Sequence, residues 1–97
     1  MIDLNDIASQ CAECARKRGK TKGDVEHWQT AGGISDELME FIKASENEPS
    51  GHLPEYTEAV EELADVLIVC LTELNRRNVD VERVITDKLE FNKHRDV

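Results

Sequence analysis

Two pairs of acidic residues have the clearest capacity for chemistry in this sequence. Glu37 and Glu40 lie three positions apart, and Glu62 and Asp65 repeat that spacing. In a helix, side chains at this spacing lie about 60° apart around the axis, so each pair can reach one cation. Carboxylates that face one another across two helices are stable when hard cations lie between them, and oxygen ligands suit Mg²⁺ or Mn²⁺ better than zinc. These four acids therefore predict a Mg²⁺ site in which Mn²⁺ can substitute.

A solvated acidic surface is the alternative interpretation, because pairs at this spacing arise by chance in a chain with 21 Asp plus Glu. The residues around Asp65 argue against it for the second pair. Six consecutive apolar residues follow Asp65, and no Lys or Arg lies three or four positions away on either side. An unpaired carboxylate on a buried helix is costly unless it is protonated or bound to a cation. We therefore expect Asp65 to have a metal ion as its partner.

Three polar residues near the C-terminus form a second candidate group. Val81 and Ile85 begin a helical stripe that continues, at spacings of three and four, through Lys88, Asn92 and Arg95. One interpretation is a helix end whose cations interact favourably with the helix dipole. The other is a binding surface in which Lys88 and Arg95 contact phosphates and Asn92 contacts a sugar or phosphate oxygen.

His27 and Trp28 form a third candidate, because an aromatic ring and an imidazole can stack on a nucleobase or hydrogen-bond to it. A single tryptophan is more often part of a protein core. Both interpretations of this pair stay open at the level of sequence.

The hydrophobic pattern predicts an all-α fold, because four segments have helical periodicity and none alternates as a strand would. We expect helices over 2–18, from an N-cap at Asp24 to 44, over 55–77, and from a cap at Asp80 toward the C-terminus. The turn-forming stretch 46–54 separates the middle two helices, and Gly32 and Gly33 could interrupt the second. The prediction is a four-helix bundle forming one domain over 1–97.

Burial in a chain of 97 residues is marginal, and this one contains only one Trp, one Tyr and two Phe. The third helix is apolar all the way round between Val66 and Leu71, which predicts burial on several sides. Four short helices are too few to cover it. We therefore expect a homo-oligomer, either a dimer or a tetramer.

The composition restricts the possible partners and the cellular location. Twelve Lys plus Arg against 21 Asp plus Glu give a formal charge of −9, which disfavours duplex nucleic acid. No apolar run is long enough to span a bilayer, so no membrane partner is expected. Three cysteines cannot all pair, which favours a reducing cytoplasm. Cys11 and Cys14 lack a second ligand pair at zinc spacing and lie on an apolar stripe, which predicts buried thiols.

Taken in order along the chain, these motifs resemble the MazG-like all-α nucleoside triphosphate pyrophosphohydrolases. The resemblance covers roughly residues 24–95, and it depends on the ordered set of motifs more than on any one of them. The matching stretches are Ser35-Asp36-Glu37-Leu38-Met39-Glu40, Glu61-Glu62-Leu63-Ala64-Asp65-Val66 and Lys88-Leu89-Glu90-Phe91-Asn92-Lys93-His94-Arg95.

The resemblance implies a helical bundle that works as a dimer or a dimer of dimers and cleaves a nucleoside triphosphate between its α- and β-phosphates. Lys88 and Asn92 would then face the nucleotide. Independently of the resemblance, the metal mechanism needs a general base, for which we expect Glu37 or Glu40. The four implied metal ligands are Glu37, Glu40, Glu62 and Asp65.

Two alternatives remain open at this stage. Within the same fold, a phosphoribosyl-ATP pyrophosphatase or a dUTP-type diphosphatase would use the same kind of acid cluster. In a different class, the chain would be a non-catalytic helical oligomerisation or regulatory module with a solvated acidic face. The sequence contains no code for the base preference of a nucleotide.

Overall fold

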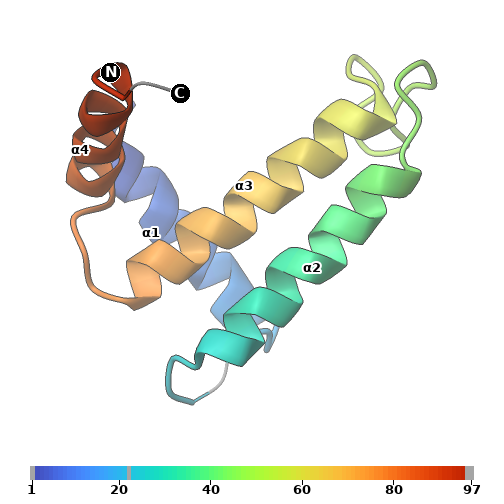
Figure 1. The fold of residues 1–97 in the computed structure, drawn as a ribbon. Coiled ribbons are helices and arrows are strands. Elements are labelled where there is room, and N and C mark those ends of the chain that lie inside the picture. The colour runs from blue at the N-terminus through green and yellow to red at the C-terminus, as the bar shows by residue number, and fades with distance from the viewer. Residues whose placement is uncertain (1, 22, 96–97) are drawn as a thin grey trace. The chain divides into compact units, whose positions relative to one another are not determined.

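The computed structural model describes residues 2–21 and 23–95, and it is helical as the sequence predicts (Figure 1). Within these residues an antiparallel bridge between Pro49 and Thr57 is isolated, and no strand forms. No described helix is long and apolar enough to cross a membrane. The helices are α1 (Leu4–Lys17), α2 (His27–Lys43), α3 (Glu58–Arg76) and α4 (Val81–Lys93).

The chain divides into two compact units, and α3 runs from one into the other. The first unit is Met1–Lys22 with Leu71–Val97, and the second is Gly23–Cys70. The first therefore holds α1, α4 and the last turns of α3, whereas the second holds α2 and most of α3.

The core of the first unit lies where α1, α4 and the end of α3 contribute small and branched apolar residues. Ala8, Leu71 and Val81 are almost fully buried there. Apolar burial of this kind is the main favourable term in folding. The partly buried side chains packed against this core are Leu4, Ile7, Cys11 and Leu74.

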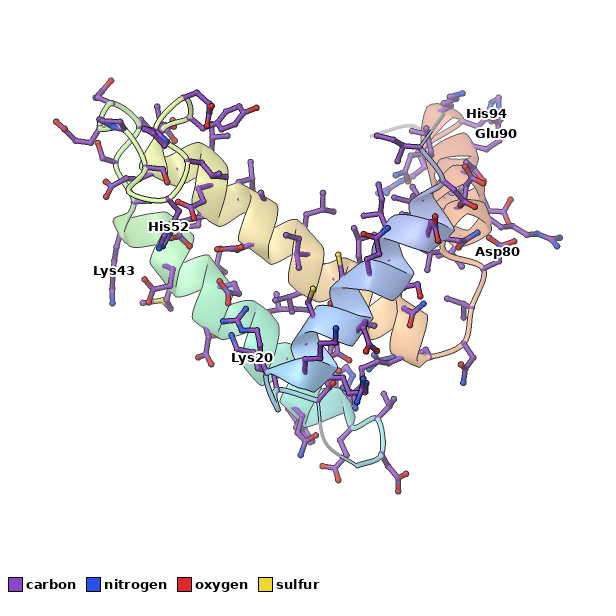
Figure 2. All side chains as sticks on the ribbon, turned by 180° about the vertical axis from the view of Figure 1, so that it is seen from behind. Lys20, Lys43, His52, Asp80, Glu90 and His94 are labelled. Carbon is purple, nitrogen blue, oxygen red and sulfur yellow. The ribbon has the colours of Figure 1, made fainter. Side chains whose placement is uncertain are left out.

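Asn5 connects α1 to the start of α4 by hydrogen bonds. Its Oδ1 accepts from the backbone N–H groups of Val81 (2.7 Å) and Glu82 (3.2 Å), and its Nδ2 donates to Asp80 Oδ1 (3.0 Å). Asp80, at the beginning of α4 (Figure 2), also accepts from the Arg83 N–H at 3.1 Å. The predicted cap at Asp80 is therefore confirmed, and Asn5 satisfies two further helix-terminal donors.

The second unit shows that both predicted starts of the middle helices are too early, by two residues for the N-cap of α2 and by three for the start of α3. α2 begins at His27, and its N-cap position is occupied by Glu26, not Asp24. The helix then continues without a break through Gly32 and Gly33. α3 begins at Glu58 because the residues before it are held in a turn. In that turn Tyr56 N–H donates to the Leu53 carbonyl at 2.9 Å.

The burial predicted for α3 is also only partly correct. Leu71 is 3% exposed, but Leu67 and Ile68 are 57% and 43% exposed. Within Gly23–Cys70, all of which the structure describes, α2 is the only other helix. A single neighbouring helix cannot cover a helix that is apolar on every side.

The cysteine prediction is wrong for one of the two residues concerned. Cys14 is exposed, and Cys11 is half-buried against the core of the first unit. Burial, together with the neighbouring Cys14, raises the pKa of the Cys11 thiol. All three cysteines are free, which agrees with the odd number in the chain.

Candidate metal centre

Three of the four predicted metal ligands come together between α2 and α3. Glu37 lies on α2, and Glu62 and Asp65 lie one turn apart on α3. Each offers a carboxylate oxygen, and these oxygens all lie within 4.8 Å of one another. All three residues are half-buried. The packing of α2 beside α3 therefore brings Glu37 to two acids that lie 25 and 28 positions later in the sequence.

Like charges are held close together in this group of three acids. None of the three acids forms an ion pair within Gly23–Cys70, a range that the structure describes completely. Partial burial raises the pKa of the Glu62 carboxyl, and the charges of nearby acids raise it further. Those acids, from the largest effect to the smallest, are Asp65, Glu61, Glu37 and Glu40.

The donor set fits a hard divalent cation. It consists only of carboxylate oxygens, which Mg²⁺ and Mn²⁺ prefer. A Mg–O distance of about 2.1 Å allows two ligands of one ion to be up to about 4.2 Å apart, so small side-chain rotations would bring this set into range. Mg²⁺ retains several water ligands when proteins bind it, and three protein ligands leave coordination positions for water or phosphate.

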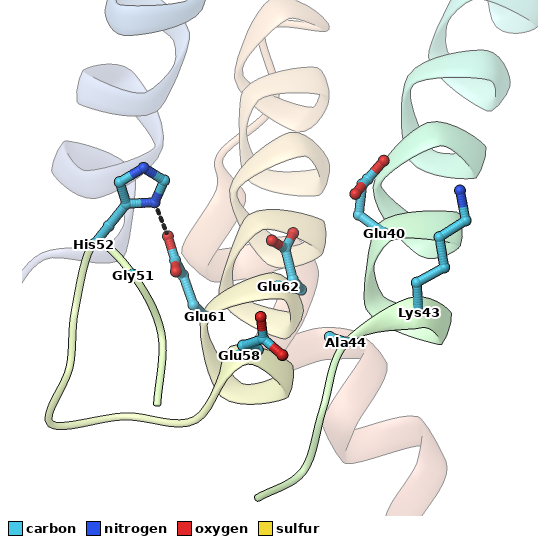
Figure 3. Close-up of a pocket in the computed structure, with 8 residues that line it drawn as sticks. All are labelled: Glu40, Lys43, Ala44, Gly51, His52, Glu58, Glu61 and Glu62. Carbon is cyan, nitrogen blue, oxygen red and sulfur yellow. Dashed lines mark hydrogen bonds and ion pairs between the residues drawn. The ribbon is translucent and has the colours of Figure 1, made fainter. Parts of the chain in front are cut away.

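Glu40, the fourth predicted ligand, lies outside this group of three. It is exposed, one helical turn beyond Glu37 on α2, and its side chain borders a cavity that Glu62 also lines (Figure 3). Its charge is close enough to contribute to the raised pKa of Glu62. Glu40 is thus next to the candidate metal centre without sharing its closest oxygens.

The cavity beside the cluster has a volume of about 240 Å³ and contains an arrangement that sequence reasoning missed. Glu61, on α3, accepts a hydrogen bond from the Ser50 hydroxyl and pairs with His52 Nδ1 at 3.0 Å (Figure 3). These two hydrogen bonds lower the pKa of the Glu61 carboxyl. Ser50 and His52 lie in a turn-rich loop whose path the sequence does not specify, so no motif signals this contact.

The loop that carries His52 is anchored to the start of α3. Ser45 N–H donates to Glu58 Oε1 at 3.1 Å, and Glu58 N–H donates to the Glu48 carbonyl at 3.0 Å. The Ser50 hydroxyl also accepts from the N–H groups of His52 and Leu53. Since these backbone groups are paired, the loop is a defined wall of the cavity.

The aromatic candidates lie at the other end of α2. The rings of His27 and Trp28 are in contact edge to face, with centroids 5.5 Å apart, and Trp28 is 82% exposed. Trp28 lies nine positions before Glu37, which corresponds to about 14 Å along a helix axis. The structure therefore does not place Trp28 in a core, and it does not bring this pair to the cavity.

The C-terminal candidates belong to the first unit. Lys88 Nζ lies 4.6 Å from the ring centroid of Phe91 on α4. Arg95 Nη1 donates to Asn92 Oδ1 at 3.3 Å. Within this unit the three predicted residues are thus near one another along one helix and its end, and their role in substrate binding stays a prediction.

Comparison of the chain with known protein families, curated proteins and solved structures finds no match in any of the three. The residues of the candidate site therefore carry the functional argument.

Proposed function

We propose that this chain is a Mg²⁺-dependent nucleoside triphosphate pyrophosphohydrolase. It would cleave ribo- or deoxyribonucleoside triphosphates between the α- and β-phosphates, producing the monophosphate and pyrophosphate. The observation that carries the proposal is the group of carboxylate oxygens from Glu37, Glu62 and Asp65, which has no cationic side chain to neutralise it within its unit. The MazG-like order of the sequence motifs supports the same activity.

In this proposal the three acids hold the metal, and the remaining residues act around it. Bound Mg²⁺ would offset the phosphate charge and polarise the phosphorus that is attacked. Glu40 is the better candidate for general base than Glu37, because it is exposed at the cavity and outside the group of three oxygens. It would accept a proton from the water that attacks the α-phosphorus while the bond to the bridging oxygen breaks.

Product analysis tests this activity. The purified chain is incubated with each canonical ribo- and deoxyribonucleoside triphosphate, with Mg²⁺ or with EDTA. We expect the monophosphate and pyrophosphate in equal amounts with Mg²⁺, and neither with EDTA. Release of orthophosphate, or no release from any nucleotide, would contradict the proposal.

A second candidate, an oligomerisation module, is favoured by the exposed apolar side chains of the second unit. Leu63, Leu67 and Ile68 on α3 and Leu38 and Ile42 on α2 are all more than two-fifths exposed. Association of copies would bury such side chains, and it is compatible with the enzymatic proposal. Multi-angle light scattering at micromolar concentration should therefore detect a dimer or tetramer, whereas a monomer would remove the support for this candidate.

A further inference from the structure

The cavity at the end of α2 adjoins the candidate metal centre, because Glu62 belongs to both. Its volume of about 240 Å³ is below the usual range of about 300–1,000 Å³ for pockets that enclose a whole ligand. A cavity of this size suits one part of a nucleotide.

The charges of the lining disfavour phosphate and favour groups that donate hydrogen bonds. Four carboxylates line the cavity, against the cation Lys43 and the imidazole of His52. Carboxylates repel a phosphate unless a metal ion intervenes, and they accept hydrogen bonds from N–H groups. The phosphates therefore belong on the side of the metal cluster, which leaves the cavity to the nucleoside. The four carboxylates are Glu40, Glu58, Glu61 and Glu62.

His52 supplies a flat ring at the wall of the cavity. The ring is 88% exposed, yet its Nδ1 is held by Glu61 Oε2 at 3.0 Å. Glu61 is in turn anchored by the hydroxyl of Ser50, which is 3% exposed. An exposed ring that is already oriented loses little freedom when a base stacks on it.

Glu58 supplies a hydrogen-bond acceptor at the same cavity. Its Oε1 accepts from the Ser45 N–H, and its Oε2 has no partner within the fully described range Gly23–Cys70. Lys43 also lines the cavity, but Figure 3 shows its ammonium directed away from the Glu58 carboxylate. Cytosine and adenine present an amino donor, whereas uracil and hypoxanthine present a carbonyl in place of the amino group. A carboxylate oxygen accepts a hydrogen bond from the amino group and repels the carbonyl oxygen.

We propose that this cavity binds the nucleobase of the substrate and selects bases with an exocyclic amino group, with Glu58 accepting from that amine and the base stacked on His52. This inference rests on the proposed function for its substrate class. Its test uses nucleosides, which carry no phosphate, so that it does not depend on metal binding or hydrolysis.

Nuclear magnetic resonance titrations of the whole chain in EDTA supply that test. Cytidine, 2′-deoxycytidine and adenosine should shift the backbone signals of Gly51 and His52 and bind about tenfold more tightly than uridine and inosine. Equal binding of cytidine and uridine, a preference that depends on the 2′-hydroxyl, or no shift with any nucleoside would overturn the inference. Absence of nucleotide hydrolysis alongside selective nucleoside binding would instead contradict only the proposed activity.

Variants separate recognition from structural support. His52→Ala should weaken cytidine binding, whereas His94→Ala, which removes a similarly exposed histidine paired with Glu90 at 2.9 Å on α4 (Figure 2), should not. In Glu58→Gln, the Ser45 N–H would hold the amide oxygen and leave the NH₂ for the cavity. That variant should reverse the preference from cytidine toward uridine. Loss of all binding in Glu58→Gln with helical circular dichroism unchanged, or an unchanged preference, would contradict the role of Glu58.

Discussion

Helix α3 contains two pairs of charged residues at i, i+3 spacing. One pair joins an acid to an arginine, and the other consists of two acids. In the first unit both carboxylate oxygens of Glu73 accept hydrogen bonds from Arg76 Nη1 at 3.1 Å. Arg77 Nη1 also lies 3.2 Å from Glu73 Oε2. In the second unit Glu62 has Asp65 at that spacing and Glu37 across from it on α2. Glu73 and Glu62 are both at least half-buried, so the two sites differ in the sign of the charges that surround the acid.

This difference indicates separate roles for the two ends of the helix. An acid with two arginines is already neutralised, and its contacts contribute to the stability of the fold. Three clustered acids repel one another, and this repulsion adds to partial burial in raising the pKa of the Glu62 carboxyl. We therefore expect the paired charges to stabilise the fold and the like charges to be the place where a cation binds.

The largest expected effect is that of Asp65→Asn, which keeps the volume and removes one like charge. Because repulsion is relieved, we expect the metal-free variant to be at least as stable as the wild type. Because a metal ligand is lost, turnover should fall about 100-fold or more, and the rise in melting temperature that Mg²⁺ causes in the wild type should disappear. Thermal melts with EDTA and with excess Mg²⁺ measure the first and third effects.

Asp36→Asn is the matched control for that variant, because Asp36 is an exposed acid next to Glu37 on α2. It should leave both the stability and the Mg²⁺ response unchanged. If Asp65→Asn behaves in the same way, Asp65 is a surface acid. If it lowers the stability of the metal-free protein, its carboxylate supports the fold.

Glu73→Gln should have the opposite effect on stability. It removes the charge partner of Arg76 and Arg77 where the side chains of Glu73 and Arg76 are only 13% and 14% exposed. The expected loss in the free energy of unfolding is about 1–3 kcal/mol, measured by urea denaturation. Glu13→Gln removes an exposed pair with Arg16 at the same spacing, and its loss in the free energy of unfolding should be clearly smaller, because solvent screens exposed pairs. Equal losses in the two variants would mean that burial of the pair adds nothing.

The smallest effect is a pH dependence of the metal-free protein that differs in sign between the two units. The raised pKa of Glu62 means that the folded state binds this proton more tightly than the unfolded state, whose value is near 4.5. Its contribution to stability should therefore increase as the pH falls toward 4.5. The lowered pKa of Asp80, which follows from its bonds with Asn5 and the Arg83 N–H, has the reverse effect. Its contribution is present above 3.8 and is lost as the pH falls below that value.

Urea denaturation in EDTA between neutral pH and pH 3 measures both contributions. Glu62→Gln should remove the gain above pH 4.5, and Asp80→Asn should reduce the loss below pH 3.8. Superimposable pH profiles for Glu62→Gln and the wild type would mean that the acids of the second unit do not repel one another.

The sequence predicted the helical class, the separation of the helices by a turn-rich loop, the cap at Asp80 and the acids that form the cluster. These features depend on residues at most a few positions apart, whose geometry in a helix is known in advance. The starts of α2 and α3 were missed because bonds in the preceding segments decide them, such as the bond from Tyr56 N–H to the Leu53 carbonyl. Helix existence is a local property, whereas helix boundaries respond to what the flanking chain contacts.

The sequence by itself determined that Glu62 and Asp65 share a side of one helix, because that spacing is a property of the helix. Only the tertiary structure decided that Glu37, 25 positions before Glu62, joins them and that Glu40 lines the cavity instead. It also decided that Ser50 and His52 meet Glu61. Contacts of this kind depend on the path of the loop and the packing of α2 against α3, which no short-range pattern specifies.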